Sequence, residues 1–227
     1  MTEGWLFDYG GTLDTGGQHW GKVLWHAYER RHMPVTEQQF REAYVHAERT
    51  LGKNPIIRPD DTFRKTLETK VRLQLAFLGV EDDDSLQTLV DDVYAIAVQQ
   101  TARSREVLLQ LKSQCPLVLV SNFYGNLSVV LREFGLDGLF ETVVESAVVG
   151  VRKPDPRIFL LGAEALGLPP SKVTAVGDSL EKDIIPAKQA GCRTVWLQGE
   201  GWTAYEPSAP EADRVIHRLD ELLENNE

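Results

Sequence analysis

Asp8 is the first residue of the chain whose type and position could do chemistry. It follows the apolar run Trp5-Leu6-Phe7 and precedes, after Tyr9, the pair Gly10-Gly11. The apolar run predicts the end of a buried strand, and the glycines predict a sharp turn. A carboxylate at the carboxyl end of a strand stands where open α/β sheets bind ligands. It can act as a nucleophile, as a metal ligand or as both, although the same pattern also fits an aspartate that caps a helix.

Three later segments also end predicted strands with polar side chains. They read Val118-Leu-Val-Ser121-Asn122, Gly150-Val-Arg-Lys153-Pro-Asp155-Pro156 and Ala175-Val-Gly-Asp178-Ser-Leu-Glu-Lys-Asp183. Each is a weak signal by itself, because Lys-Pro-Asp-Pro is also a plausible start of a helix. Four such segments in one chain indicate that polar side chains gather at one edge of a sheet.

The elements that must position these residues alternate in the second half of the chain. Short apolar runs predict strands at residues 116–121, 142–149, 172–176, 193–197 and 214–216. Helical stretches separate them at residues 127–134, 158–166 and 184–190. This alternation predicts βαβ units. We therefore expect an α/β fold, a Rossmann-like parallel sheet with helices on both faces, with residues 1–15 supplying its first strand.

The segment from about Gly17 to Gln100 reads as helical nearly throughout. Apolar residues recur at helical spacing within residues 20–27, 67–78 and 86–98, and breaks fall at 33–34, 52–55 and 79–85. We expect residues 16–100 to be an insertion into a core made of residues 1–15 and 101–227. The final Glu-Asn-Asn-Glu is expected to fray.

Composition limits the classes of partner. The chain has 227 residues, 42% of them hydrophobic, and a formal net charge of -10. This charge argues against sequence-independent binding to nucleic acid or to an anionic membrane. No apolar run approaches the roughly 20 residues that span a bilayer, and the N-terminus has no basic leader. Cys115 and Cys192 fit buried thiols in a reducing compartment, so we expect a cytoplasmic protein.

The four segments, in this order, resemble the four motifs of the haloacid dehalogenase (HAD) superfamily over essentially the full chain. The resemblance implies that residues 16–100 form a small α-helical cap over the site. It implies Asp8 as the nucleophile that forms an aspartyl-phosphate, with Lys153 steadying the transferred group. It implies a small phosphorylated substrate, bound through Ser121, Asn122, Thr12 and Gly11. It implies Mg²⁺ as cofactor, held by Asp8, Asp178, Asp183 and the carbonyl of Gly10.

The physics agrees with these implied roles. In-line attack on a phosphoryl group by a carboxylate needs cationic charge, which magnesium and one lysine supply. Magnesium binds a few carboxylates together with water and substrate oxygens. Clustered carboxylates without a cation would repel one another and raise their pKa values. The sequence makes no prediction of the oligomeric state.

Gly10 departs from the resembled pattern. Phosphatases of the superfamily carry an aspartate there, which uses its backbone carbonyl for magnesium and its side chain for proton transfer. Gly10 keeps the carbonyl and loses the carboxylate, so metal binding should survive while protonation of the leaving group suffers. Such help is typically worth about 10²–10⁴-fold. The loss should matter most for esters with poor leaving groups.

Three explanations of Gly10 stay open. In the first, a phosphatase uses an undemanding substrate or another proton donor, for which Asp14, His19 and His26 are candidates with ordinary turn or helix roles as alternatives. In the second, the chain resembles phosphonoacetaldehyde hydrolases, which have a small residue there and need a cap lysine. The candidate lysines are Lys22, Lys53, Lys65 and Lys70, of which Lys53, in a predicted loop, is the most suggestive. In the third, a degenerate member binds a phosphorylated metabolite or a protein partner without turnover.

The cap is expected to select the substrate and to move. Candidate substrate contacts in the cap are Tyr44, His46, Arg49, Lys53 and Arg58. Asn122, Phe123 and Tyr124 follow Ser121 and are better placed to touch substrate. We expect residues Thr15 to Trp20 and Gln100 to Arg105 to absorb the motion of the cap.

Overall fold

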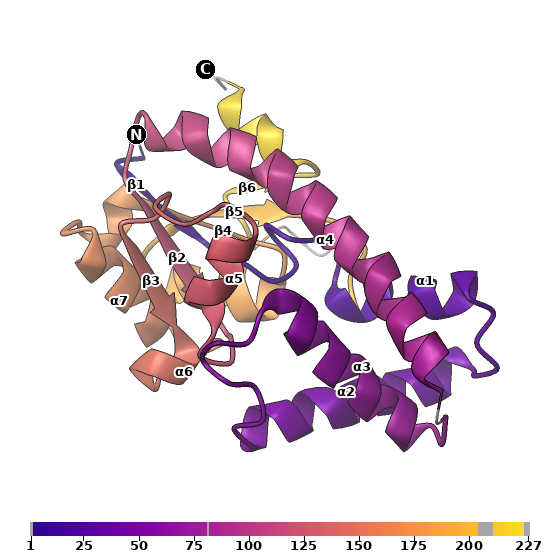
Figure 1. Cartoon of the computed structure of the whole chain (residues 1–227). Coiled ribbons are helices and arrows are strands. Elements are labelled where there is room, and N and C mark those ends of the chain that lie inside the picture. The colour runs from indigo at the N-terminus through magenta and orange to yellow at the C-terminus, as the bar shows by residue number, and fades with distance from the viewer. Residues whose placement is uncertain (1, 81, 204–210, 225–227) are drawn as a thin grey trace.

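The core of the protein is one sheet of six parallel strands. The computed structural model describes residues 2–80, 82–203 and 211–224; the expected fraying at the end of the chain falls mostly outside these residues. The strands are β1 (Gly4–Phe7), β2 (Leu117–Ser121), β3 (Thr142–Glu145), β4 (Val173–Gly177), β5 (Arg193–Leu197) and β6 (Arg214–Ile216). They lie in the order β3-β2-β1-β4-β5-β6 (Figure 1). The strand order therefore reverses at β1, which is where such sheets bind ligands.

Helices cover both faces of this sheet, as the sequence predicted. They are α4 (Asp83–Lys112), α5 (Leu127–Glu133), α6 (Ser146–Val149), α7 (Arg157–Ala165) and α8 (Ile185–Gln189). Alternate residues of β2 face opposite layers. Leu117 and Leu119 pack in the cluster that holds α4 and α5, whereas Val118 and Val120 pack in the cluster that holds α7. This alternation explains why β2 reads as an unbroken apolar run.

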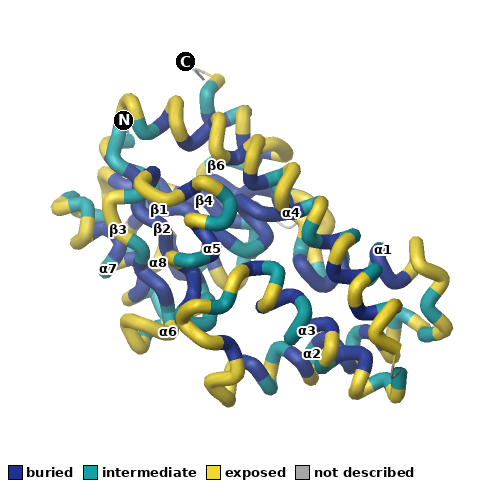
Figure 2. The backbone as a smooth tube through the Cα atoms, in the orientation of Figure 1, coloured by how far each residue is buried: buried dark blue, intermediate teal, exposed yellow. Residues whose placement is uncertain are grey.

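In the described part of the chain, four helices are inserted between β1 and β2. They are α1 (Trp20–Arg30), α2 (Glu37–Lys53), α3 (Phe63–Phe77) and α4, and we call them the inserted helices. In Figure 1, α1, α2 and α3 lie to one side of the sheet while α4 runs back over it. Their buried apolar residues join the cluster that packs on one face of the sheet. The interior is thus continuous from the sheet into the inserted helices (Figure 2).

Side chains of the core hold the start of α3. Thr62 caps this helix by accepting from the backbone N–H of Lys65. Glu133 at the end of α5 accepts from the backbone N–H of Phe63 (2.5 Å). Asn126 donates from Nδ2 to the carbonyl of Asp61 (2.9 Å). The first two bonds satisfy N–H groups that the first turn of a helix leaves unpaired. All three fix α3 over the loop after β2.

The segment after β5 also reaches the inserted helices. The Trp202 ring lies against Tyr44, with centroids 4.9 Å apart. The Arg41 guanidinium lies 4.4 Å from the Trp202 ring centroid and donates to the Trp202 carbonyl (2.8 Å). Gly21 in α1 leaves room for this ring, because a Cβ there would lie 2.0 Å from Trp202 Cζ3.

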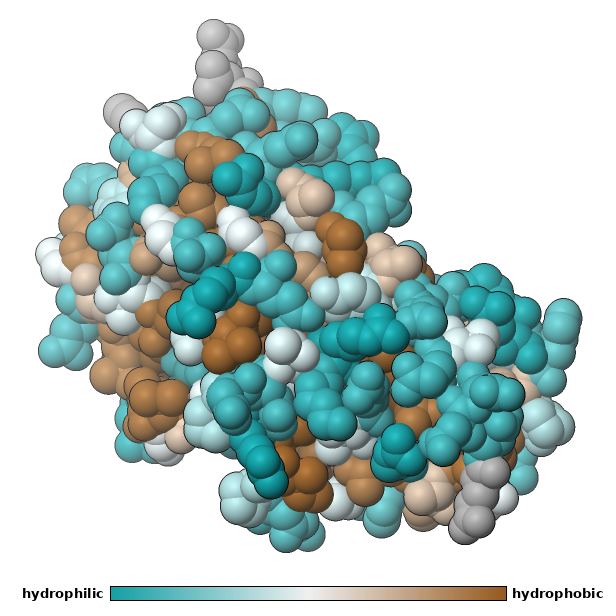
Figure 3. All heavy atoms as spheres, viewed as in Figure 1, coloured by the Kyte–Doolittle hydropathy of each residue, from teal (hydrophilic) through white to brown (hydrophobic). Residues whose placement is uncertain are grey.

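The predicted strand over residues 142–149 is wrong in its second half. β3 ends at Glu145, and Ser146–Val149 form the short helix α6. The apolar run suggested a buried strand, but Val148 is 71% exposed. Figure 3 shows apolar side chains at the surface on the side where α6 and α7 lie. An apolar run at the edge of a sheet therefore does not establish burial.

One expectation about helices is confirmed and another needs correction. The predicted helix at 184–190 is α8, and a π-helical turn, Leu180–Ile184, precedes it. The predicted linker from Gln100 to Arg105 lies inside α4. The prediction rested only on the expected boundary of the insertion, whereas Ser104 is buried in the helix and donates from Oγ to the carbonyl of Leu13 (2.8 Å). Among the described residues, none of the helices is both long and apolar enough to cross a membrane.

Candidate active site

Asp8 stands at the carboxyl end of β1, between the ends of the two neighbouring strands. Its backbone N–H donates to the carbonyl of Val176 on β4 (3.0 Å). Ser121 is the last residue of β2, and Asp178 directly follows β4. Because parallel strands end at the same edge of a sheet, these side chains come together beyond it.

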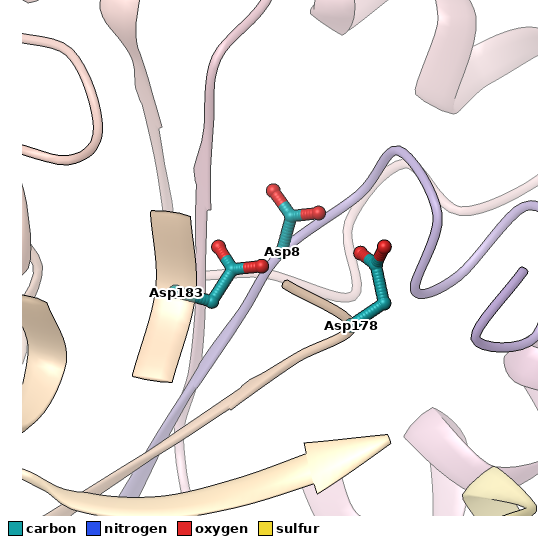
Figure 4. A group of neighbouring side chains, drawn as sticks. All are labelled: Asp8, Asp178 and Asp183. Atoms are coloured by element: carbon teal, nitrogen blue, oxygen red, sulfur yellow. The ribbon is translucent and has the colours of Figure 1, made fainter. Parts of the chain in front are cut away.

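Three carboxylates converge on one space at this edge. One oxygen from each of Asp8, Asp178 and Asp183 lies within 4.8 Å of the others. Figure 4 shows that each carboxylate is carried by a different segment and reaches the same region. Asp183 belongs to the π-helical turn and accepts from the backbone N–H of Ser179 (3.0 Å). Gly177 is needed for this approach, because a Cβ there would lie 2.3 Å from the Cβ of Asp183.

Lys153 joins two of the three carboxylates. Its Nζ lies 2.6 Å from Oδ1 of Asp8 and 2.6 Å from Oδ1 of Asp183. Asn122 holds the backbone of this lysine: its Oδ1 accepts from the Lys153 N–H (2.9 Å) and its Nδ2 donates to the Lys153 carbonyl (3.0 Å). In this structure the amide of Asn122 is thus engaged in positioning Lys153.

The electrostatics of the cluster explain how it accommodates these charges. Burial raises the pKa of Asp8 to about 6, against the lowering effect of the Lys153 ammonium. Burial raises the pKa of Asp178 well above its ordinary value, and the Asp183 and Asp8 carboxylates add to the rise. Burial alone would lower the pKa of Lys153, but Asp183 and Asp8 raise it above its ordinary value. One ammonium among three carboxylates leaves the cluster short of positive charge, and these oxygen donors fit Mg²⁺.

Small side chains complete the site. Ser121 donates from Oγ to Oδ1 of Asp8 (3.2 Å). Thr12 donates from Oγ1 to Oδ1 of Asp178 (3.1 Å). Gly11 has φ 98°, and a Cβ there would lie 2.4 Å from Oδ1 of Asp178. The turn after β1 therefore needs glycine at this position both for its backbone conformation and for the close approach of Asp178.

A cavity of about 540 Å³ connects this cluster to the inserted helices. On the inserted side its lining includes Tyr44, Glu48 and Lys70, and on the core side Tyr124. The Lys70 ammonium lies 2.7 Å from Oε1 of Glu48. Tyr124 donates from its hydroxyl to Oε2 of the same glutamate (3.0 Å). An ion pair between a buried lysine and a half-buried glutamate thus lines the same cavity as the carboxylate cluster.

Residues 3–191 match the sequence profile of haloacid dehalogenase-like hydrolases. The chain belongs to this family. Among curated relatives, the glyceraldehyde 3-phosphate phosphatase of Pyrococcus furiosus is 34% identical over 131 residues, which cover 56% of this chain and 54% of that protein. The phosphoserine phosphatase of Thermus thermophilus is 40% identical over 90 residues, which cover 40% of this chain and 34% of that protein. The matched region is thus about half, or less, of these relatives' length.

Solved structures of HAD-like proteins share the fold. The HAD-hydrolase YfnB from Bacillus subtilis, in a form bound to magnesium, superposes with a TM-score of 0.59 at 22% identity, covering 97% of this chain and 96% of that one. A dehalogenase superposes with a TM-score of 0.66 at 21% identity, covering 97% of this chain and 95% of that one. Both likenesses extend over the sheet and the inserted helices.

Gly10 of this HAD-like hydrolase faces an aromatic ring instead of open solvent. A Cβ on Gly10 would lie 3.9 Å from Cδ1 and 4.0 Å from Nε1 of Trp20. That indole donates from Nε1 to Oδ2 of Asp14 (2.9 Å). Oδ1 of Asp14 accepts from the backbone N–H of Gly11 (2.7 Å). Asp14 is fully buried, and burial raises its pKa to about 7.

The two candidate histidines have different surroundings. His19 is the N-cap of α1, where its Nδ1 accepts from the backbone N–H of Gly21 (3.0 Å). It lines the cavity, and burial lowers its pKa to about 4. His26 is exposed and lies within hydrogen-bond distance of Glu29 and Glu200. His26 does not line the cavity.

The structure divides the predicted substrate contacts and the candidate lysines of the cap. Tyr44, Lys53 and Lys70 line the cavity of the carboxylate cluster, as do Asn122, Phe123 and Tyr124. His46 and Arg49 line a second hollow, which includes Phe77 and Trp202, and Arg58 lines neither. Lys22 and Lys65 pair with Glu37 and Glu68 away from the cavity. Sequence reasoning missed Glu48, although its position four residues after Tyr44 places it on the same helix face.

Proposed function

We propose that this HAD-like hydrolase is a magnesium-dependent phosphatase of small phosphorylated metabolites, with Asp8 as the nucleophile. The observation that carries the proposal is the contact of the Lys153 ammonium with Asp8 and Asp183 beside the third carboxylate, Asp178. The phosphatase names of the relatives support the reaction class. A formal net charge of -10 supports a small substrate over nucleic acid or an anionic membrane.

The residues of the site divide the work of phosphoryl transfer. Asp8 attacks phosphorus through a carboxylate oxygen, and the aspartyl-phosphate forms on that residue. Lys153 and the Ser121 hydroxyl donate to the transferred oxygens and disperse their negative charge. Asp8, Asp178, Asp183 and the Gly10 carbonyl would hold the metal ion. When bound, Mg²⁺ offsets the negative charge of the phosphoryl group.

The inserted helices are proposed as a cap that selects the substrate. The Lys70–Glu48 pair and the Tyr124 hydroxyl stand across the cavity from Asp8 and present both donors and acceptors. Such a lining suits a polar leaving group. We also propose a reducing, cytoplasmic setting, which the free thiols Cys115 and Cys192 support.

C–P bond cleavage through a Schiff base is a weaker alternative. That chemistry needs a neutral amine on the cap. Lys70 is the buried lysine of the cap lining, but the Glu48 carboxylate raises its pKa well above the ordinary value despite its burial. Lys70 is therefore held as an ammonium. The other candidate lysine that lines the cavity, Lys53, is exposed.

The experiment is a turnover assay with and without Mg²⁺. The panel contains acetyl phosphate, p-nitrophenyl phosphate, glyceraldehyde 3-phosphate, phosphoserine and phosphonoacetaldehyde. We expect Mg²⁺-dependent phosphate release that Asp8→Asn abolishes. Asp155→Asn is the matched control, because this aspartate is bonded to Arg157 at the surface. Magnesium-dependent binding of phosphate esters without turnover would instead favour a binding protein, and borohydride trapping at Lys53 or Lys70 would favour C–P cleavage.

A further inference from the structure

Asp14 is a buried carboxyl group that the reaction described so far does not use. It has no solvent exposure, yet it lines the same cavity as Asp8 and Gly10. Each of its oxygens accepts one N–H donor, from Gly11 at 2.7 Å and from Trp20 at 2.9 Å. A carboxyl oxygen has a second lone-pair position, so Asp14 retains the capacity to bind a proton or a water molecule.

The direction in which a side chain at position 10 would point connects Asp14 to the missing acid. A side chain on residue 10 would point toward Trp20, whose Cδ1 and Nε1 lie 3.9 Å and 4.0 Å from the Cβ position. The same indole N–H holds the Asp14 carboxyl group. The absent side chain would thus point toward the same indole N–H that Asp14 accepts.

We propose that Asp14, held by Trp20 and Gly11, is the proton-transfer group of this enzyme in place of a carboxylate at position 10. This inference rests on the proposed phosphatase function. Asp14 acts through one water molecule in the cavity. The carboxyl group comes from the end of the turn after β1, four residues beyond Gly10, so the same turn supplies nucleophile and acid.

The proton balance follows the two steps of the reaction. In the first, an Asp8 oxygen bonds to phosphorus, the bond from phosphorus to the leaving oxygen breaks, and that oxygen takes a proton that Asp14 releases. In the second, a water oxygen attacks the aspartyl-phosphate and its proton passes to the Asp14 carboxylate. The bond between phosphorus and Asp8 then breaks and phosphate leaves. Asp14 ends protonated and Asp8 ionised, as they began.

The surroundings of Asp14 suit exchange of a proton near neutrality. Burial raises its pKa to about 7, the Gly11 and Trp20 N–H groups oppose the rise, and the Asp8 charge adds to it. The buried Tyr9 hydroxyl is a further titratable group that senses Asp14, and burial, together with the Asp14 charge, raises its pKa well above the ordinary value. A proton donor with a pKa near the working pH is the effective one for general acid–base help.

The test compares leaving groups in Asp14→Asn. For an alkyl phosphate, which needs protonation, we expect turnover to fall by about 10²–10⁴-fold. For p-nitrophenyl phosphate, a leaving group that needs no proton, we expect one equivalent of nitrophenol in a rapid burst, followed by slow turnover because the aspartyl-phosphate is no longer hydrolysed. Ser104→Ala, which removes a buried bond to the adjacent Leu13 carbonyl, is the structural control and should change both substrates alike.

Two further variants keep the test decisive. Gly10→Asp in the Asp14→Asn background should restore most of the alkyl phosphatase activity; the Cβ itself would make only ordinary contacts, the nearest at 3.9 Å from Trp20 Cδ1. Trp20→Phe removes the N–H that stabilises the Asp14 carboxylate, so the limb of the pH–rate profile set by Asp14 should move to higher pH. If the Asp14→Asn variant does not fold, the shift of the pH–rate profile in Trp20→Phe alone tests the proposal.

The outcomes separate this inference from the proposed function. A wild-type protein without phosphatase turnover overturns the function, and the inference with it. An active wild-type protein whose Asp14→Asn variant loses alkyl and aryl turnover equally, without a burst, overturns the inference alone. A pH–rate profile of Trp20→Phe in which the limb set by Asp14 does not move also overturns the inference alone.

Discussion

Lys153 and Asp8 are 145 residues apart in sequence, yet the lysine Nζ lies 2.6 Å from Oδ1 of the aspartate, with 2% and 9% of their side chains exposed. The contact depends on the parallel sheet, which brings the end of β1 beside the loop that follows α6. The lysine is shared with Asp183, so two of the three clustered carboxylates have a cation even before a metal binds. Both the electrostatics and the stability of the site should therefore depend on this one ammonium.

Lys153→Met should destabilise the protein as well as abolish turnover. Asp8 and Asp183 would lose their buried cation, and breaking a buried ion pair on one side costs about 3–5 kcal/mol. The loss should diminish as the pH falls, because burial has already raised the pKa of Asp8 to about 6 and its protonation removes an uncompensated charge. Denaturant unfolding of the metal-free protein at several pH values measures this. Lys172→Met, which breaks the exposed pair with Glu3, is the control and should have little effect; an equal effect of both would contradict the argument.

Asp178→Asn should stabilise the metal-free protein and remove its response to Mg²⁺. Burial and the neighbouring carboxylates raise the pKa of Asp178, so its charge is costly without a metal. In the wild type, Mg²⁺ at about 100 times its Kd should contribute about 2.7 kcal/mol, seen as a higher Tm. The variant should begin at a higher Tm and show no such rise. A persistent Mg²⁺ response would place the metal elsewhere.

His19 should make the protein sensitive to acid between pH 6.5 and 4. Burial lowers its pKa to about 4 in the folded state, below the ordinary value of 6.5. Its stabilising contribution is therefore full above pH 6.5 and is lost as the pH falls through about 4; the shift corresponds to about 3 kcal/mol at most. Charging the ring also removes the acceptor that caps α1.

His19→Asn is the variant that isolates this titration. Asparagine keeps an N-cap acceptor but does not titrate, so the slope of stability against pH should flatten in this range. The variant loses ring contacts with Tyr44 and Trp202, so a uniformly lower Tm is expected. An unchanged slope would show that His19 is not the group responsible.

Two helical glycines should respond in opposite directions to alanine. A Cβ on Gly21 would lie 2.0 Å from Trp202 Cζ3, and overpacking of this kind costs about 1–3 kcal/mol. A Cβ on Gly52 near the end of α2 would meet Arg152 Nη1 at 3.9 Å, an ordinary contact. Gly52→Ala should therefore gain about 0.5–1 kcal/mol. Urea unfolding of both variants checks the pair; equal signs would mean that the Trp202 ring moves away at little cost.

Asp8, Ser121 and Asp178 could be predicted to meet because each ends or directly follows a strand. Lys153 and Asp183 instead come from the loop after α6 and from a π-helical turn, so their place in the cluster was implied by the resemblance of the motifs. The apolar runs before Asp8, Ser121 and Asp178 are short and continuous, and the parallel sheet aligns their ends. The predicted strand is wrong over the second half of the run at 142–149, because the apolar side chains there belong to a short helix at the surface, where Val148 is exposed. The hydrophobic pattern alone does not distinguish a buried strand from an apolar run at the surface.

Residues that act through distant partners could not be predicted. Glu48 has no sequence signal until Lys70 and Tyr124 are brought against it. Ser104 fell within a predicted linker because nothing in the local sequence shows that its hydroxyl bonds to the Leu13 carbonyl, 91 residues away. Asp14 could be named as a candidate, but its burial and its bond to Trp20 became apparent only from the fold.

The continuity of α4 has a consequence for access to the cavity. Its 30 residues contain neither glycine nor proline, and such a helix is about 45 Å long and curves only gently. The other connection between the sheet and the inserted helices contains Gly16 and Gly17, both at positive φ. The cavity therefore has one stiff side and one compliant side, and we expect any opening to be a shallow tilt about the Gly16–Gly17 connection. Such an opening would favour small phosphorylated substrates over phosphate groups carried on folded macromolecules.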